Sequence, residues 1–292
     1  MDRNAEWVEE MLEKLLAPTP DLPENLRKAM RYSLFAGGKR LRPTLVLAAA
    51  ECCGLRPRKA LKTAAAFEMI HTYSLIHDDL PAMDDDDLRR GKPTNHKIFG
   101  EAMAILAGDG LLTKAFEAAA ANAAELKLDG EAAAELIRLI AYGAGGEGMV
   151  GGQVADLAAE GLGRRRKAAR ILEAVHRRKT GALIAASLDA GAVLAGASNA
   201  QRGALRAYGE CVGLSFQIAD DVLDVIGDKK KMGKLGSDRD NGKLTYVSLY
   251  GLDGANRKAR ALARAAHAHL KLFGPKAELL HRLADYIIER DK

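Results

Sequence analysis

Apolar residues recur at intervals of three and four along almost the whole chain, which is the spacing of one buried face of an α-helix. The pattern predicts helices over residues 26–34, 45–53, 60–76, 102–119, 132–141, 168–194, 205–225, 255–272 and 277–288. Residues 1–16 alternate acidic and apolar positions at the same spacing. Gly37-Gly38 and Gly274-Pro275 are among the helix-ending signals that separate these ranges. No segment shows the alternation of a strand, so the sequence predicts an all-α fold.

Composition supports the same fold class. Of the 292 residues, 48% are hydrophobic and only 5% are aromatic, with alanine dominating the apolar fraction. Alanine favours helices, whereas aromatic and β-branched residues favour strands. No Ser/Pro-rich linker divides the chain, so we expect residues 1–292 to form a single helical domain.

The charge and cysteine content limit the possible partners and locations. The net charge of +5 is a mild excess, and no aromatic residues are interleaved with the basic runs, so we expect no nucleic-acid partner. The three cysteines, Cys52, Cys53 and Cys211, lack the spacing of a metal site and fit a reducing compartment. We therefore expect a cytoplasmic protein.

Two stretches of the chain are candidates for a targeting or membrane segment, and neither has the features of one. Residues 1–16 lack the basic start and continuous apolar core of a signal peptide. Residues 181–197 are rich in Ala and Gly, are shorter than a membrane span and contain Asp189. We expect a buried helix there and no stable membrane insertion.

Two clusters of aspartate follow apolar helical runs. The first consists of Asp78, Asp79 and residues 84–87. The second consists of Asp220, Asp221 and Asp224. Residues 76–80 and 218–222 also resemble each other, as two helices would if they brought carboxylates to one cavity from opposite sides. Such crowding of like charges is unfavourable unless a cation neutralises it.

The carboxylate clusters predict Mg²⁺ binding. All the candidate ligands are hard oxygens, and no His/Cys set suited to Zn²⁺ is present. Mg²⁺ usually binds through one or two carboxylates together with substrate phosphates. A solvated acidic surface could explain residues 84–87, but it explains residues 220–224 poorly because apolar runs flank them. An EF-hand is excluded, since Arg89 stands where its loop requires glycine.

Basic residues accompany both clusters and suit a diphosphate substrate, since arginine binds phosphate bidentately and lysine acts as a point charge. They are Lys39, Arg42, Arg89, Arg90, Lys179, Lys234 and Lys243. Each one alone would ordinarily be a solvated surface residue. Residues 164–167 are also basic, but they lie near no motif, and we expect a solvated helix start there.

These residues together resemble the short-chain trans-prenyl diphosphate synthases, closest to the bacterial farnesyl diphosphate synthase (geranyltranstransferase) type. Residues 74–91, SLIHDDLPAMDDDDLRRG, are similar to the family's first aspartate-rich motif in its longer form. Further matches are GGKRLRP at 37–43, GGQ at 151–153 with Asp156, KTG at 179–181, and FQ at 216–217 leading into DDVLD at 220–224. The resemblance extends from Gly37 to Tyr246.

The resemblance implies a bundle of long helices around a deep central cavity, a homodimer, and about three Mg²⁺ ions per active site, bound with substrate. The implied metal ligands are Asp78, Asp84 and Asp220, supported by Asp79, Asp221 and Asp224. The allylic diphosphate would be held by Arg89, Lys179, Lys234 and Lys243. Isopentenyl diphosphate would be held by Lys39, Arg42, His71 and Arg90. The catalytic set beside the reacting carbons would be Lys179, Thr180 and Gln217.

Some positions keep a second interpretation. His71 lies in an apolar run and, without the motif, would be read as a core histidine. We assign no ligand to Gln153 or Asp156. Leu244 stands where relatives commonly carry a smaller residue, which leaves the geometry near Lys243 in doubt.

The implied reaction condenses isopentenyl diphosphate with dimethylallyl or geranyl diphosphate and releases pyrophosphate. Tyr73 lies five residues before Asp78 and could block the path of the growing chain. An aromatic residue there resembles enzymes that make farnesyl diphosphate, although ordinary core packing would also explain it.

Four rival functions remain. A geranyl or geranylgeranyl diphosphate synthase would differ only in the depth of the cavity. A terpene cyclase would not need a second diphosphate site, which Lys39, Arg42 and Arg90 supply. A non-catalytic subunit of a heteromeric synthase should have lost the aspartates or their basic partners.

Overall fold

The structure is a computed structural model, which describes residues 2–159, 168–226 and 244–289. Helices account for nearly all of this part of the chain, and the all-α prediction is confirmed. They are α1 (Asp2–Leu15), α2 (Glu24–Leu34), α3 (Leu41–Cys52), α4 (Leu61–Asp78), α5 (Asn95–Phe99), α6 (Glu101–Glu125), α7 (Gly130–Ala144), α8 (Met149–Ala159), α9 (Ala168–His176), α10 (Ala182–Leu194), α11 (Asn199–Ile226), α13 (Tyr246–His269) and α14 (Glu278–Glu289).

Shorter elements join these helices. They are the 3₁₀ turns η1 (Pro57–Ala60) and η3 (Lys271–Ala277), the π-helical turn η2 (Arg177–Gly181), and the strands β1 (Leu88–Arg89) and β2 (Lys92–Pro93). The two strands form a small antiparallel hairpin, with Leu88 opposite Pro93. The sequence predicted one helix over residues 168–194. Helical structure does cover this range, but the π-helical turn η2 divides it into α9 and α10.

The apolar spacing did not predict α8. Its sequence begins in a glycine-rich stretch, where Gly151 and Gly152 interrupt the apolar pattern and lower the intrinsic helix propensity. Packing against η2 compensates for that weakness.

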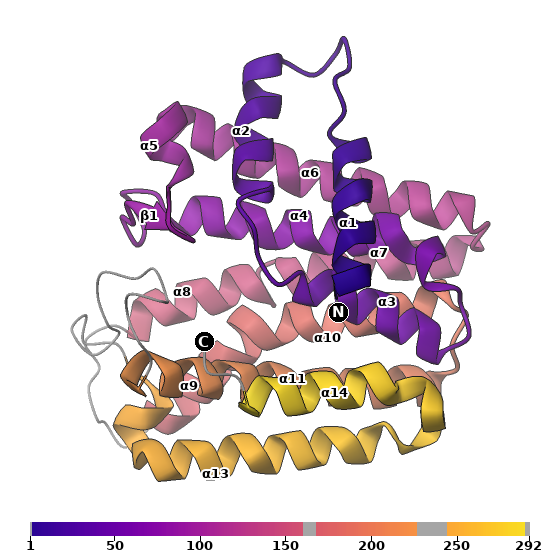
Figure 1. Cartoon of the computed structure of the whole chain (residues 1–292), viewed down its shortest axis with the longest axis vertical. Helices are drawn as coiled ribbons and strands as arrows, with labels where there is room; N and C mark the ends of the chain where they lie inside the picture. The colour runs from indigo at the N-terminus through magenta and orange to yellow at the C-terminus, as the bar shows by residue number, and fades with distance from the viewer. Residues whose placement is uncertain (1, 160–167, 227–243, 290–292) are drawn as a thin grey trace.

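The helices form two packed groups that share α10 (Figure 1). In the first group, α4 and α6 run side by side, and α1 and α2 pack against them. In the second group, α11 lies against α13 and α14. Between the groups, α10 packs against α3, α7 and α11. Every residue from Leu183 to Leu194 is consequently buried, as expected for residues 181–197, and a helix buried on all sides is apolar on all faces.

None of the helices in the described ranges has the length and apolar character needed to cross a membrane. Asp189 illustrates why α10 belongs in the protein interior. Its fully buried carboxylate accepts from Arg202 Nε at 2.6 Å and lies 3.1 Å from Arg206 Nη2, so both charges on α11 offset its burial.

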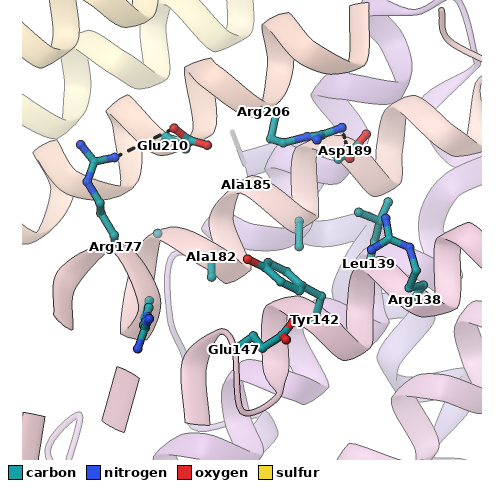
Figure 2. Close-up of a pocket in the computed structure, with 13 residues that line it drawn as sticks. Arg138, Leu139, Tyr142, Glu147, Arg177, Ala182, Ala185, Asp189, Arg206 and Glu210 are labelled. Atoms are coloured by element: carbon teal, nitrogen blue, oxygen red, sulfur yellow. Dashed lines mark ion pairs between the residues drawn. The ribbon is translucent and has the colours of Figure 1, made fainter. Parts of the chain in front are cut away.

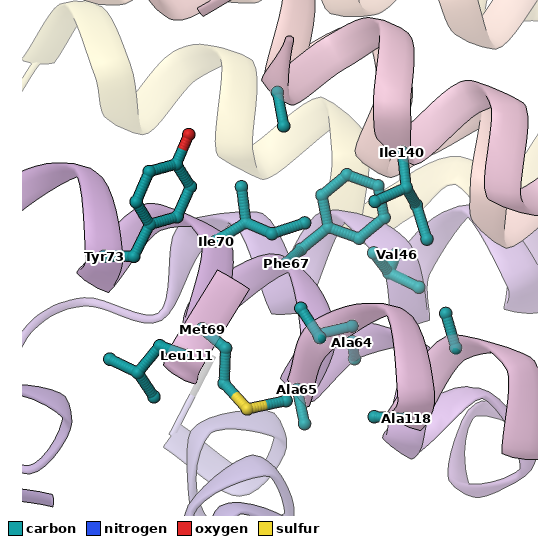
Figure 3. Packing of buried hydrophobic residues seen from close by; sticks show 14 of the residues in the cluster. Val46, Ala64, Ala65, Phe67, Met69, Ile70, Tyr73, Leu111, Ala118 and Ile140 are labelled. Atoms are coloured by element: carbon teal, nitrogen blue, oxygen red, sulfur yellow. The ribbon is translucent and has the colours of Figure 1, made fainter. Parts of the chain in front are cut away.

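The core of the first group is centred on α4 (Figure 3). Phe67, Ile70 and Tyr73 follow one another along α4, and the Met69 side chain lies near Leu111 of α6. Successive turns of α4 therefore present three large side chains in a row. This row follows the path predicted for the growing chain.

A buried arginine ties the first group to the start of α3. Arg40 has a left-handed backbone conformation, with φ of 48°, and its side chain is turned away from solvent. Its guanidinium donates to Glu68 of α4 at 2.7 Å, to Glu9 of α1 at 2.7 Å and to the Leu34 carbonyl of α2 at 2.7 Å. One side chain thus fixes three helices, and it leaves its neighbours Lys39 and Arg42 outside this network.

Replacing Arg40 with methionine is expected to lower the free energy of unfolding by about 3–5 kcal/mol, because Glu68 would remain buried without a partner. Chemical denaturation followed by circular dichroism measures the change. The matched control is Lys114→Met, which removes the surface pair between Lys114 and Glu117 and should cost less than about 1 kcal/mol. Equal losses in both variants would contradict a structural role for the Arg40 network.

Candidate active site

The end of α4 and the turn after it bring Asp78 and Asp84 together. The Asp84 amide donates to the Asp78 carbonyl at 2.9 Å, and the Asp85 amide donates to the Leu80 carbonyl at 3.2 Å. Asp85 adopts a left-handed conformation, with φ of 50°, that closes the turn. The four residues between the Asp pair and Asp84 therefore form a bulge that returns the chain to the end of the helix.

Asp78 occupies an environment that suits a cation. Burial raises the pKa of Asp78 to about 6, and the neighbouring carboxylates of Asp84 and Asp79 act in the same direction, whereas Lys179 and Arg89 oppose them. In the part of the chain that the structure describes, no side chain donates a hydrogen bond to the Asp78 carboxylate. A divalent ion would supply the missing positive charge, and hard carboxylate oxygens are the donors that Mg²⁺ prefers.

Asp79 has a different partner. Its carboxylate, 3% exposed for the whole residue, accepts from Arg89 Nε at 2.8 Å and also from Arg89 Nη2. Arg89 Nη2 donates in addition to Asp86 at 2.9 Å. Burial raises the pKa of Asp79, and Arg89 partly offsets this effect. Asp79 and Asp86 thus orient Arg89, while Asp87 pairs with Lys97 at 2.7 Å on the surface.

The loop before α3 and the turn after β1 meet. Arg90 has a left-handed conformation, with φ of 54°, and its Nη1 donates to the Gly37 carbonyl. A side chain at Gly38 would lie within 2.8 Å of the Arg90 guanidinium, so glycine is required for this approach. The structure therefore brings together two basic segments that are 50 residues apart in sequence.

Arg42 and His71 join this basic group. Burial lowers the pKa of Arg42 to about 10, which keeps the side chain cationic at neutral pH. Its buried Nε has no hydrogen-bond partner among the residues that the structure describes. Burial, assisted by Arg42 and Arg90, lowers the pKa of His71 well below its usual value, so this imidazole is neutral. His71 is partly exposed beside these arginines and is not an isolated core histidine. A buried unpaired donor next to several cations suits an anionic ligand.

Sequence reasoning missed one neighbour of this group. The ring centroid of Tyr286 on α14 lies 5.5 Å from Lys39 Nζ, within the range of a cation–π interaction. Helical spacing had indicated only that α14 is amphipathic, and nothing in the sequence linked its tyrosine to a lysine near the other end of the chain.

Glycine also explains how α8 approaches η2. A side chain at Gly152 would lie 2.5 Å from the Cα atom of Lys179, so only glycine fits. This close packing places Asp156 of α8 within 2.8 Å of Lys179 Nζ. Asp156, to which the sequence assigned no role, is thus the partner that orients Lys179. The GGQ motif with Asp156 was the signal that could have indicated it.

Thr180 and Gln217 contact each other. The Thr180 hydroxyl, carried by the π-helical turn η2, donates to Gln217 Oε1 of α11 at 3.0 Å. Single π-helical turns frequently occur at functional sites, and here the turn separates Lys179 and Thr180 from regular helical packing.

The second aspartate cluster follows Gln217 on the same helix. Asp221 accepts from the backbone amide of Tyr246 at 2.7 Å and is 3% exposed, and Asp224 is also buried. Asp220 is the least buried of the three, and its charge acts on Arg42. The charge of Lys179 similarly acts on Asp78. Each cluster therefore has a basic residue from a distant segment near it, Arg42 for Asp220 and Lys179 for Asp78. Lys234, Lys243 and residues 164–167 lie outside the described residues.

Within the described ranges, no three His, Cys, Asp or Glu side chains converge as a complete metal cage.

A separate cavity of about 440 Å³ borders η2 (Figure 2). Its floor is formed by Ala182, Ala185 and Ala186, and the Tyr142 ring lies beside it. Arg206 pairs with Asp189 there. Lys179 and Thr180 do not line this cavity, so we do not assign it to the aspartate site.

The sequence matches of the chain agree with this geometry. The model of the polyprenyl synthetase family matches residues 23–272. The chain belongs to the polyprenyl synthetase family. The resemblance inferred from the motifs is confirmed, and so is the enzyme class, a trans-prenyl diphosphate synthase.

Individual relatives are similar over most of their length. The farnesyl diphosphate synthase of Bacillus subtilis (strain 168) is 47% identical over 93% of this chain and 90% of its own length. A chloroplastic geranylgeranyl pyrophosphate synthase of Catharanthus roseus is 46% identical over 92% of this chain and 75% of its own. The crystal structure of an FPP/GFPP synthase from Zymomonas mobilis superimposes with a TM-score of 0.87 at 42% identity, covering 98% of this chain and 97% of the other.

We expect Asp78→Ala to lower turnover about 100-fold or more, because it removes the buried carboxylate that most needs a cation. Steady-state assays of pyrophosphate release measure the effect. The matched control is Asp87→Ala, whose carboxylate pairs only with Lys97 at the surface and which should stay near normal. Near-normal turnover of Asp78→Ala with intact circular dichroism would refute the assignment.

Proposed function

We propose that the chain condenses isopentenyl diphosphate with dimethylallyl and then geranyl diphosphate, and that its product is farnesyl diphosphate. The observation that carries this proposal is that two separate groups of side chains, each with at least one cation, lie beside the aspartates. One group consists of Arg42, His71 and Arg90, and the other consists of Lys179 with Thr180 and Gln217. Two diphosphate substrates need two anion sites, whereas a terpene cyclase needs only one.

The first group binds isopentenyl diphosphate. Arg42 offers a buried Nε without a partner, and Arg90 is held against Gly38. The neutral His71 can donate a hydrogen bond to a phosphate oxygen without adding charge. Lys39 completes this group.

The second group acts on the allylic substrate. Lys179, oriented by Asp156, and Arg89, oriented by Asp79, hold the leaving diphosphate, and we assign Lys234 and Lys243 to the same task. Thr180 gives its hydrogen to Gln217, so its oxygen lone pairs remain available to the allylic cation. The C–O bond breaks toward pyrophosphate, the double bond of isopentenyl diphosphate forms the new C–C bond, and pyrophosphate takes the released proton.

We assign Mg²⁺ to Asp78 and Asp84 from one side and Asp220 from the other, with about three ions per site. Mg²⁺ supplies positive charge that stabilises the diphosphate as it leaves. Asp79 and Asp221 are already bonded to Arg89 and to the Tyr246 amide, so they support the site from behind.

Tyr73 is the proposed floor of the chain-elongation path. It lies one turn before the end of α4, it is 5% exposed, and Ile70 and Phe67 follow it in the same row (Figure 3). A growing chain that extends from Asp78 along α4 meets the Tyr73 ring first. Relatives that bear the geranylgeranyl name make a deeper path the second candidate function.

The proposed function can be tested with the purified protein. It is incubated with Mg²⁺, isopentenyl diphosphate and each allylic diphosphate in turn. We expect farnesyl diphosphate as the main product from dimethylallyl and geranyl diphosphates, and loss of turnover when EDTA is added. Hydrolysis of the products and chromatography against standards reads the chain length. Geranylgeranyl diphosphate as the main product would favour the second candidate, and a cyclic hydrocarbon would favour a cyclase.

We further propose a single domain that forms a homodimer and works in the cytoplasm. The three cysteines are free, which fits a reducing compartment. Exposed apolar side chains gather on consecutive helices: Ile105 and Leu106 on α6, Tyr142 on α7, and Val150 and Val154 on α8. Faces of this kind commonly mark contacts between subunits. A relative that is 45% identical is named the large subunit of a heterodimeric geranylgeranyl pyrophosphate synthase.

In sedimentation velocity, we expect a species of twice the 31.3 kDa chain mass. Leu106→Glu should shift it toward the monomer, because a charge would be buried at the contact. The matched control is Leu272→Glu on η3, where the side chain is similarly exposed, and it should stay dimeric. A wild-type monomer would contradict the proposal.

A further inference from the structure

His77 forms a wedge between α4 and α6 that none of the functional roles above explains. Its Nε2 atom lies 3.1 Å from the backbone carbonyl oxygen of Ile105 on α6. A carbonyl can only accept, so Nε2 carries the hydrogen and donates it. The imidazole is therefore anchored to a backbone atom of the neighbouring helix, and the Asp109 carboxylate of the same helix lies farther away, 3.9 Å from Nε2.

Gly108 makes room for this wedge. A side chain at Gly108 would lie 2.5 Å from His77 Cδ2 and closer still to Nε2, so the ring occupies the space that a methyl group would need. Gly110 differs, because its nearest neighbour would be the flexible Met30 side chain, with Sδ at 3.2 Å. An alanine substitution at Gly108 would therefore displace the His77 ring, whereas the same substitution at Gly110 would not touch it.

The other side of the imidazole contacts Tyr73. The two ring centroids are 5.7 Å apart, and the ring planes meet at 80°, an edge-to-face arrangement. Tyr73 lies four residues before His77 on α4, so the two side chains share a helix face. With α6 behind it, His77 blocks the direction in which the Tyr73 ring could tilt away from its row.

We infer that His77 is a positioning residue for product length, because it holds the Tyr73 ring across the elongation path. This inference rests on the proposed function, in which Tyr73 ends the growth of the prenyl chain. A floor side chain sets chain length only if its orientation is fixed against the pressure of the growing chain. His77 supplies that fixation through its ring, which fills the space between Tyr73 and α6, and Gly108 is the residue that makes room for the ring.

Removing the wedge should open the path. In His77→Ala, the Tyr73 ring gains space toward α6, and we expect the geranylgeranyl share of the product to rise several-fold. His77→Phe keeps a ring against Tyr73 without the hydrogen bond to Ile105, and farnesyl diphosphate should remain its main product. The double variant His77→Ala/Tyr73→Ala should give the same distribution as Tyr73→Ala, since His77 acts through Tyr73. Loss of stability alone lowers turnover without producing this pattern.

The glycines provide a test in the opposite direction. Gly108→Ala pushes the imidazole off α6 toward Tyr73. The Tyr73 ring should then shorten the elongation path, and the amount of geranyl diphosphate should rise at least several-fold. Gly110→Ala, the matched control, should keep the wild-type distribution because the Met30 side chain can move aside.

The product distributions of all these variants, measured at equal conversion with dimethylallyl diphosphate, separate the possible failures. A wild type that makes no prenyl product overturns the proposed function. A Tyr73→Ala variant with an unchanged distribution overturns the floor, and the role of His77 with it. A third outcome would overturn only the inference about His77. In that outcome Tyr73→Ala makes longer products, whereas His77→Ala and Gly108→Ala both make the wild-type products.

Discussion

Three carboxylates, Glu68, Asp78 and Asp79, lie wholly or partly buried on α4 and at its end, and the way in which each is neutralised organises the rest of the molecule. Glu68 is paired with Arg40, which also bonds α1 and α2. Asp79 is paired with Arg89 of the β1–β2 hairpin. Asp78 has neighbouring charges but no bonded cation among the described residues, and burial raises its pKa to about 6. Buried carboxylates without a partner are costly, so two arginines neutralise two of these acids, and the third is the one that we propose binds a metal ion.

The two basic groups differ in what holds them. Arg90 reaches its place because Gly38 has no side chain, and Lys179 reaches its place because Gly152 has none. In both cases a glycine allows a charged residue to approach a segment that is distant in sequence, the loop before α3 for Arg90 and α8 for Lys179. The π-helical turn η2 adds a second local irregularity, which turns Thr180 toward Gln217. Departures from regular structure are therefore concentrated where the substrates are proposed to bind.

Helical spacing was sufficient to predict the all-α fold, because the apolar faces of α4, α7 and α11 are long and regular. It failed at α8, where Gly151 and Gly152 weaken the pattern and only packing against η2 stabilises the helix. The motifs led us to expect Thr180 and Gln217 beside the reacting carbons, and the structure adds a hydrogen bond of 3.0 Å between them. They gave no indication that Asp156 orients Lys179 or that Tyr286 covers Lys39, because neither pairing follows from local sequence.

The sequence by itself determined most of the helices, the aspartate clusters and the family, because periodicity and motif spacing are local properties of the chain. Only the tertiary structure decided how the acids divide their tasks. Asp78 and Asp79 are adjacent in sequence, yet one lies near Lys179 without bonding it and the other is bonded by Arg89. Burial and the direction of each side chain set that difference, and both depend on which distant helix packs against α4. The same dependence on packing places His77 between Tyr73 and Gly108.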